Sequence, residues 1–192
     1  MDICSKLEAV NDSHVQYVLL RSCFSLPKVM FLMRTTNPSV CLDLWIYFDK
    51  IIRDSFSHIV GVGIGDLGWR QAQLPVSKGG LGLRGARDHA AAAFCSSVIF
   101  AESYFAEWQK EISLEACVKE LSDLTGLQLE KPGLKGVPQK ELSNWVDKNS
   151  AALLLDKAPS VREKACLGGL ALNHSGDYHH LLGSTSRTQS SA

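Results

Sequence analysis

The chain has 192 residues, a hydrophobic share of 45% and a formal net charge of zero. This composition is typical of a globular protein with a core, and it excludes a nucleic-acid binder that is basic throughout, so any binding electrostatics must be local. The first residues include charges, and no stretch reaches the roughly 18 unbroken apolar residues of a membrane span. We therefore expect no signal peptide, no membrane contact and a cytoplasmic or nuclear location.

The first third of the chain predicts helices. Apolar residues at intervals of three and four indicate an amphipathic helix over 4–24. Pro27 ends it and suits the first turn of a short helix that runs to Leu32. The strongest pattern covers 39–60, where a broad apolar stripe lies opposite charged residues and Gly61 ends the helix. The residues of this helix that we expect in the core are Trp45, Phe48, Ile52 and Phe56.

The rest of the chain is also predicted to be mainly helical. We expect helices over 86–109, 113–124 and 138–155, a loop over 130–137, and at most short strands over 73–76 and 82–84. The fold class that follows is all-α: an irregular helical bundle with a glycine-rich connecting loop and a further C-terminal helical segment. The expected units are a bundle over 1–68, the glycine-rich basic loop with its following helices over 69–129, a C-terminal helical segment over 130–183 and a disordered tail over 184–192.

No metal, cofactor or catalytic motif stands out. The six cysteines are far apart and form no C-x-x-C pair, so we expect free, buried thiols. Cys166, His174, His179 and His180 do not have zinc-ligand spacing, and we interpret the histidines as surface or capping residues. The aspartates at 43, 49 and 54 are scattered along one helix and are interpreted as a solvated face.

Two segments, 63–68 and 80–85, have the spelling of the dinucleotide fingerprint G-x-G-x-x-G. That fingerprint requires a buried strand before it and a helix after it. The first segment follows a predicted helix and leads to Trp69 and Arg70, where no helix is expected, and the second follows Pro75 in a segment unlike a central strand. We therefore expect no bound dinucleotide and no other cofactor.

The segment 74–87, LPVSKGGLGLRGAR, contains glycines and cations but no acidic residue. Glycines at 79, 80 and 82 allow positive φ and close approach of the backbone to another surface. The four cations of this region, which we expect to contact phosphate groups, are Arg70, Lys78, Arg84 and Arg87. An equally weighted alternative is a solvated loop between helices, whose glycines serve turns only.

The stretch from Val15 to Val98, with LLRSCFSLPKVMFLMRTTNP and then LPVSKGGLGLRGARDHAAAAF, resembles the region downstream of the catalytic palm in reverse transcriptases of non-long-terminal-repeat (LINE-type) retrotransposons. In that family, a run of the form xLPxxxGGLGLR followed by an alanine-rich helix lies in or just after the thumb. A second similarity is in KACLGGLALNHSGDY, where His174 to Asp177 fit the family pattern and Tyr178 replaces the expected tryptophan.

The family's polymerase activity depends on a palm with a Y-x-D-D hairpin, and this sequence contains no adjacent aspartates. Two-metal phosphoryl transfer requires such ligands. The resemblance thus implies a non-catalytic thumb and connection module that contacts the backbone of an RNA–DNA or RNA template–primer without reading bases.

Two rival functions belong to other classes. One is a helical protein-interaction scaffold, because a thumb without its palm would expose an apolar face to a protein partner. The other is a small enzyme that uses His89, His174 or Cys166, although no motif places a nucleophile beside a base.

Overall fold

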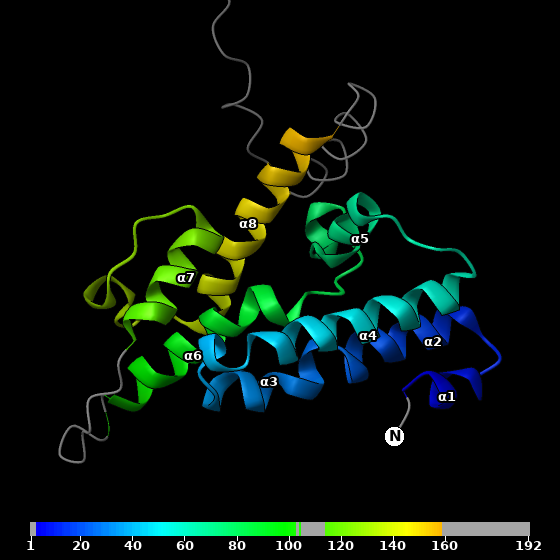
Figure 1. Ribbon diagram of the computed structural model, residues 1–192, viewed down its shortest axis with the longest axis horizontal. Coiled ribbons are helices and arrows are strands. Elements are labelled where there is room, and N and C mark those ends of the chain that lie inside the picture. The colour runs from blue at the N-terminus through cyan, green and yellow to red at the C-terminus, as the bar shows by residue number, and fades with distance from the viewer. Residues whose placement is uncertain (1–2, 103, 105–113, 159–192) are drawn as a thin grey trace, which may run out of the picture.

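The computed structural model describes residues 3–102, 104 and 114–158 of the chain (Figure 1). Within these ranges the protein consists of helices and connecting turns, with no strand. The predicted all-α class is therefore confirmed. The short strands expected over 73–76 and 82–84 are wrong: the first stretch contains the end of a helix and the start of a 3₁₀ turn, and the second is irregular.

The predicted helix over 4–24 is divided into several pieces. Helix α1 is Ile3–Glu8, and α2 is Ser13–Leu19, which leads directly into a π-helical turn at Leu20–Phe24. Asp12 explains the break, because its Oδ1 accepts a hydrogen bond from the backbone N–H of Val15 at 2.9 Å and so caps α2. Periodicity alone did not reveal this internal cap.

Helices α3, Leu26–Thr35, and α4, Leu42–Val60, agree closely with the prediction. Gly61 adopts φ +71° and ends α4 in the left-handed conformation that glycine tolerates. Of the expected core residues, Trp45, Ile52 and Phe56 are buried and Phe48 is half-buried between two core clusters.

Helix α5, Asp66–Gln73, was not predicted. It has one short buried face, formed by Trp69 and Ala72, which lie three residues apart and pack into the core that α4 lines. A 3₁₀ turn at Val76–Lys78 follows. Trp69 is thus a core residue, whereas Arg70 beside it is exposed.

Helix α6, Ala86–Glu102, lies between the two halves of the fold (Figure 1). It packs against α3 and α4 on one side, and against α7, Glu115–Thr125, and α8, Gln139–Lys157, on the other. The four alanines of 90–93 have no exposed surface, and their small side chains let several helices approach α6 at once.

These contacts join the units expected from the sequence. Helix α6, from the expected 69–129 unit, shares one core cluster with α3 and α4 and another with α7 and α8. Of the predicted 86–109 helix, residues after 102 belong to the described chain only at Tyr104. The part of the expected 130–183 unit after 158, and the expected tail over 184–192, lie outside the described residues.

Candidate nucleic-acid interface

The glycines of the 74–87 segment are required by contacts within the chain itself. A Cβ on Gly80 would overlap the backbone carbonyl of Leu74, and one on Gly82 would lie 2.9 Å from Nε of Arg21. Gly79 and Gly82 have φ near +75° and +72°. The close approach expected at these positions is therefore made to the protein's own chain, and the turn conformations expected of glycine are present.

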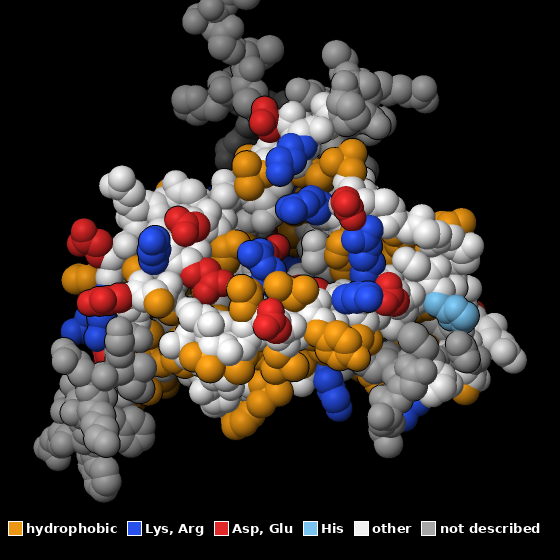
Figure 2. Space-filling model, in the orientation of Figure 1, with side chains coloured by type: hydrophobic (Ala, Val, Ile, Leu, Met, Phe, Trp, Pro, Cys, Tyr) orange, Lys and Arg blue, Asp and Glu red, His pale blue; other side chains and the backbone are white. Residues whose placement is uncertain are grey.

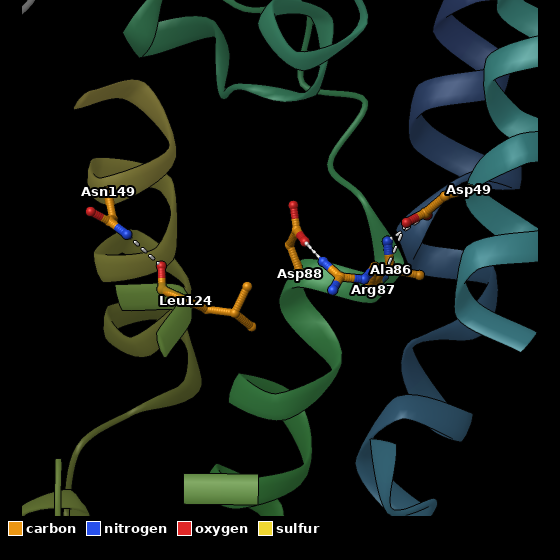
Figure 3. Close-up of polar contacts among 6 residues, drawn as sticks. All are labelled: Asp49, Ala86, Arg87, Asp88, Leu124 and Asn149. Atoms are coloured by element: carbon orange, nitrogen blue, oxygen red, sulfur yellow. Dashed lines mark hydrogen bonds and ion pairs between the residues drawn. The ribbon is translucent and has the colours of Figure 1, made fainter. Parts of the chain in front are cut away.

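The segment ends where Asp49 of α4 caps helix α6. Asp49 Oδ1 accepts a hydrogen bond from the backbone N–H of Ala86 at 2.6 Å, and Oδ2 accepts one from Arg87 at 3.0 Å (Figure 3). Burial raises the pKa of Asp49 to about 6, although these two hydrogen bonds act in the opposite direction. The interpretation of Asp49 as part of a solvated face is therefore wrong, whereas Asp43 and Asp54 are exposed as expected.

Arg84 is held by a buried carboxylate of α8. Its Nη2 lies 2.6 Å from Oδ2 of Asp147, whose side chain is only 4% exposed. The other oxygen of Asp147 lies 3.4 Å from Nε2 of His89, which is also buried. This cluster links the glycine segment, the start of α6 and the middle of α8. Arg84 thus compensates an internal charge, and His89 is not the surface or capping residue expected.

Arg70 and Arg87 are exposed, and both line two adjoining hollows of about 140 and 410 Å³. The smaller hollow lies between α5, the start of α6 and α8, where Lys157 joins the lining. The larger lies between α4, α5 and the start of α6, where Lys50 joins it. We refer to the two hollows together as the α5–α8 cleft. Figure 2 shows Lys and Arg side chains around the hollowed surface between α5 and α8.

Direct pairing neutralises some of the charged residues of the cleft and leaves others unpaired. Asp66 pairs with Arg53 at 2.8 Å, and Asp88 pairs with Arg87 at 3.2 Å (Figure 3). Within the described ranges, three of the lining cations form no ion pair, and Asp123 is the lining acid that neither pairs nor caps a helix. These cations are Lys50, Arg70 and Lys157. The lining contains as many aspartates as lysines and arginines, so the cleft offers an external anion individual unpaired cations and no excess of positive charge.

Lys78 lies in a different place. It lines a separate hollow of about 410 Å³ together with Lys140 and Lys148 of α8, and Glu141 is the acidic residue in that lining. The four predicted cations are therefore not brought to a single site. Arg70 and Arg87 share the α5–α8 cleft, Lys78 joins a lysine cluster, and Arg84 is engaged by Asp147.

Sequence reasoning missed the lysines that line the hollow at Lys78 and the α5–α8 cleft. Lys140 and Lys148 are eight residues apart on a helix that the sequence does predict, so helical spacing could have placed them on one face. Lys50 and Lys157 carry no such signal, because they come from α4 and from the end of α8, and only tertiary packing places them beside Arg70.

The other motifs considered above have simple structural outcomes. The 63–68 fingerprint does lead into a helix, α5, contrary to expectation, but α4 precedes it where a strand would be needed. No group of three or more metal-binding side chains is found in the described part of the chain. Cys166, His174, His179 and His180 lie outside that part.

No family model, curated protein or solved structure matches the chain. None of the helices in the described ranges is long and apolar enough to cross a membrane.

Proposed function

We propose that this protein is a non-catalytic module that binds the sugar–phosphate backbone of an RNA–DNA or RNA template–primer in the α5–α8 cleft. The supporting observation is the set of exposed cations around the cleft, of which Lys50, Arg70 and Lys157 have no ion-pair partner among the described residues. The resemblance of the 15–98 stretch to the thumb region of LINE-type reverse transcriptases supports the same function.

The chemistry of the cleft favours contact with phosphates over reading of bases. Lysine and arginine neutralise phosphate charge and release counterions, which gives affinity that does not depend on sequence and falls as salt rises. Arg87 can add a contact at the junction of the two hollows, because its pairing with Asp88 is at a surface where its side chain is 49% exposed. Arg84 is not part of the proposed interface, because its guanidinium group is paired with the buried carboxylate of Asp147.

The test is binding of a fluorescent RNA–DNA hybrid, measured by anisotropy at low salt. The double variant Arg70→Ala/Lys157→Ala removes two cations that line the smaller hollow. The matched control is Lys28→Ala/Lys119→Ala, which removes two exposed lysines of α3 and α7 that do not line the cleft. Both variants carry the same net charge, so a difference between them reports position and not total charge.

We expect the cleft variant to lose about ten-fold or more in affinity, equally for hybrids of different sequence, because each phosphate contact contributes independently of the base. The control is expected to stay within about two-fold of the wild type. Equal losses for the two variants, or no binding by the wild-type protein at low salt, would contradict the proposal.

A specific observation favours the alternative function, a helical scaffold for a protein partner with no role in nucleic-acid binding. Leu44 and Tyr47, three residues apart on α4, are 49% and 63% exposed, and Val40 just before the helix is 79% exposed. Figure 2 shows hydrophobic side chains along the lower edge of the view, over α3 and α4. A partner that is lost on changing Tyr47→Glu, while hybrid binding is absent, would support the scaffold.

A further inference from the structure

Two cysteines face each other in the interior, where α6 packs on α7. Cys95 of α6 and Cys117 of α7 place their Sγ atoms 2.8 Å apart. Both residues have no exposed surface, and both belong to the core cluster that α6, α7 and α8 share. The Sγ of Cys117 also lies 3.5 Å from the carbonyl oxygen of Ala91. The two thiols are free and hydrogen-bonded to each other.

We propose that Cys95 and Cys117 are a pair of thiols that a peroxide slowly converts to an intramolecular disulfide, which links α6 to α7. One thiolate attacks the peroxide, its sulfur becomes a sulfenic acid, and hydroxide leaves and takes up a proton to form water. The second sulfur then attacks the sulfenic sulfur and a second water leaves. The sum is two thiols and hydrogen peroxide giving one disulfide and two waters.

Geometry makes this pair suitable for the second step. The sulfenic acid formed on one cysteine meets the other sulfur at once, before a further peroxide can oxidise it to the irreversible sulfinic acid. Cys23, in contrast, is exposed, and Cys41 is half-buried. We expect Cys23 to react with peroxide sooner than the interior pair.

Burial makes the first step slow. The hydrogen bond between Cys117 and Cys95, together with burial, raises the pKa of Cys117 well above that of a free thiol, so little of the nucleophilic thiolate exists at neutral pH. Oxidation then requires transient opening of the α6–α7 contact, and its rate is expected to rise with pH. This inference is independent of the proposed nucleic-acid function, because neither cysteine lines the α5–α8 cleft.

The experiment uses the full chain. The folded wild-type protein is treated with hydrogen peroxide, the peroxide is removed with catalase, and the remaining thiols are alkylated in urea before digestion with trypsin. Cleavage after Arg87, Lys110 and Lys119 places Cys95 alone in the peptide 88–110 and Cys117 alone in the peptide 111–119. The matched variants are Cys117→Ala, which removes the pair, and Cys23→Ala, which keeps it.

We expect the 88–110 and 111–119 peptides to appear linked, two hydrogens lighter than their sum, in the wild type and in Cys23→Ala but not in Cys117→Ala. Dithiothreitol should restore both alkylatable thiols. The linked protein should unfold at about 1 M higher urea, because the bond constrains the unfolded chain. Recovery of both peptides unlinked after Cys23 is fully oxidised, or links from Cys95 or Cys117 to other cysteines, would overturn the proposal.

Discussion

Replacement of Asp49 by asparagine tests how helix α6 is anchored at the centre of the fold. Asp49 accepts hydrogen bonds from the backbone N–H groups of Ala86 and Arg87, and its burial raises its pKa from 3.8 to about 6 (Figure 3). Each unit of pKa shift corresponds to about 1.4 kcal/mol between the two protonation states. A shift of about two units therefore amounts to about 3 kcal/mol, or about 2 kcal/mol after allowance for water near a half-buried group.

The direction in which stability changes with pH follows from the raised pKa of Asp49. Because the folded-state pKa of Asp49 lies above its value in the unfolded chain, the native state holds the proton more tightly. The stabilisation from this proton is fully present below about pH 4 and is lost as the pH rises through about 6. At neutral pH the wild-type protein therefore carries a buried carboxylate that costs about 2 kcal/mol of its free energy of unfolding.

Asparagine cannot lose this proton. Its amide oxygen can keep one of the two hydrogen bonds to α6, and loss of the other costs about 1 kcal/mol at every pH. We expect Asp49→Asn to be less stable than the wild type by about 1 kcal/mol near pH 4 and more stable by about 1 kcal/mol near pH 7. Glu120, whose pKa burial also raises, contributes equally to both proteins and so cancels in the difference.

The assay is urea unfolding of both proteins at several values between about pH 4 and about pH 7. The control is Asp54→Asn, an exposed aspartate of the same helix, which should leave the pH dependence of the wild type unchanged. If Asp49→Asn loses stability with rising pH as steeply as the wild type, the carboxyl group is not buried as described and the reasoning is refuted.

Two other substitutions test the packing around the site. Gly80→Ala should destabilise the fold by about 2 kcal/mol in urea unfolding, because its Cβ would overlap the backbone of Leu74. The control Gly63→Ala has open space at its Cβ and should be close to neutral. Equal effects of the two substitutions would contradict the close approach of the chain at Gly80. Asp147→Ala should cost about 3 kcal/mol by the same assay, because it leaves Arg84 beside an empty site, and the exposed control Asp123→Ala should cost little. A loss below about 1 kcal/mol for Asp147→Ala would mean that the buried pair is not formed.

The sequence predicts the long helices well because their signals are local. Helix α4 has an apolar stripe over many turns and a glycine at its end, and α8 follows Pro138. Helix α5 was missed because eight residues that include Gly68 give too short a pattern to show a helical period. The division of the first predicted helix depends on a capping aspartate, Asp12, in a short polar stretch that the apolar periodicity on either side outweighs.

The candidate site was only partly predictable, because its charges are settled by contacts distant in the sequence. Of the four cations expected to contact phosphate, Arg70 and Arg87 line one cleft, and their contact with phosphate stays a prediction. Arg84 pairs with Asp147, which lies 63 residues further along the chain. Helix α6 is capped by Asp49, which lies 37 residues before Ala86. Neither partner can be identified from spacing, since each depends on how three helices pack.

The most direct measurement of the central claim is the salt dependence of binding of an RNA–DNA hybrid to the wild-type protein. The slope of log Kd against log salt concentration counts the phosphates that the protein neutralises, at nearly one unit for each contact. With Lys50, Arg70, Arg87 and Lys157 around the cleft, the account predicts a slope of about 4, and of about 2 for Arg70→Ala/Lys157→Ala. A wild-type slope near zero, or a slope that the double variant leaves unchanged, would contradict it.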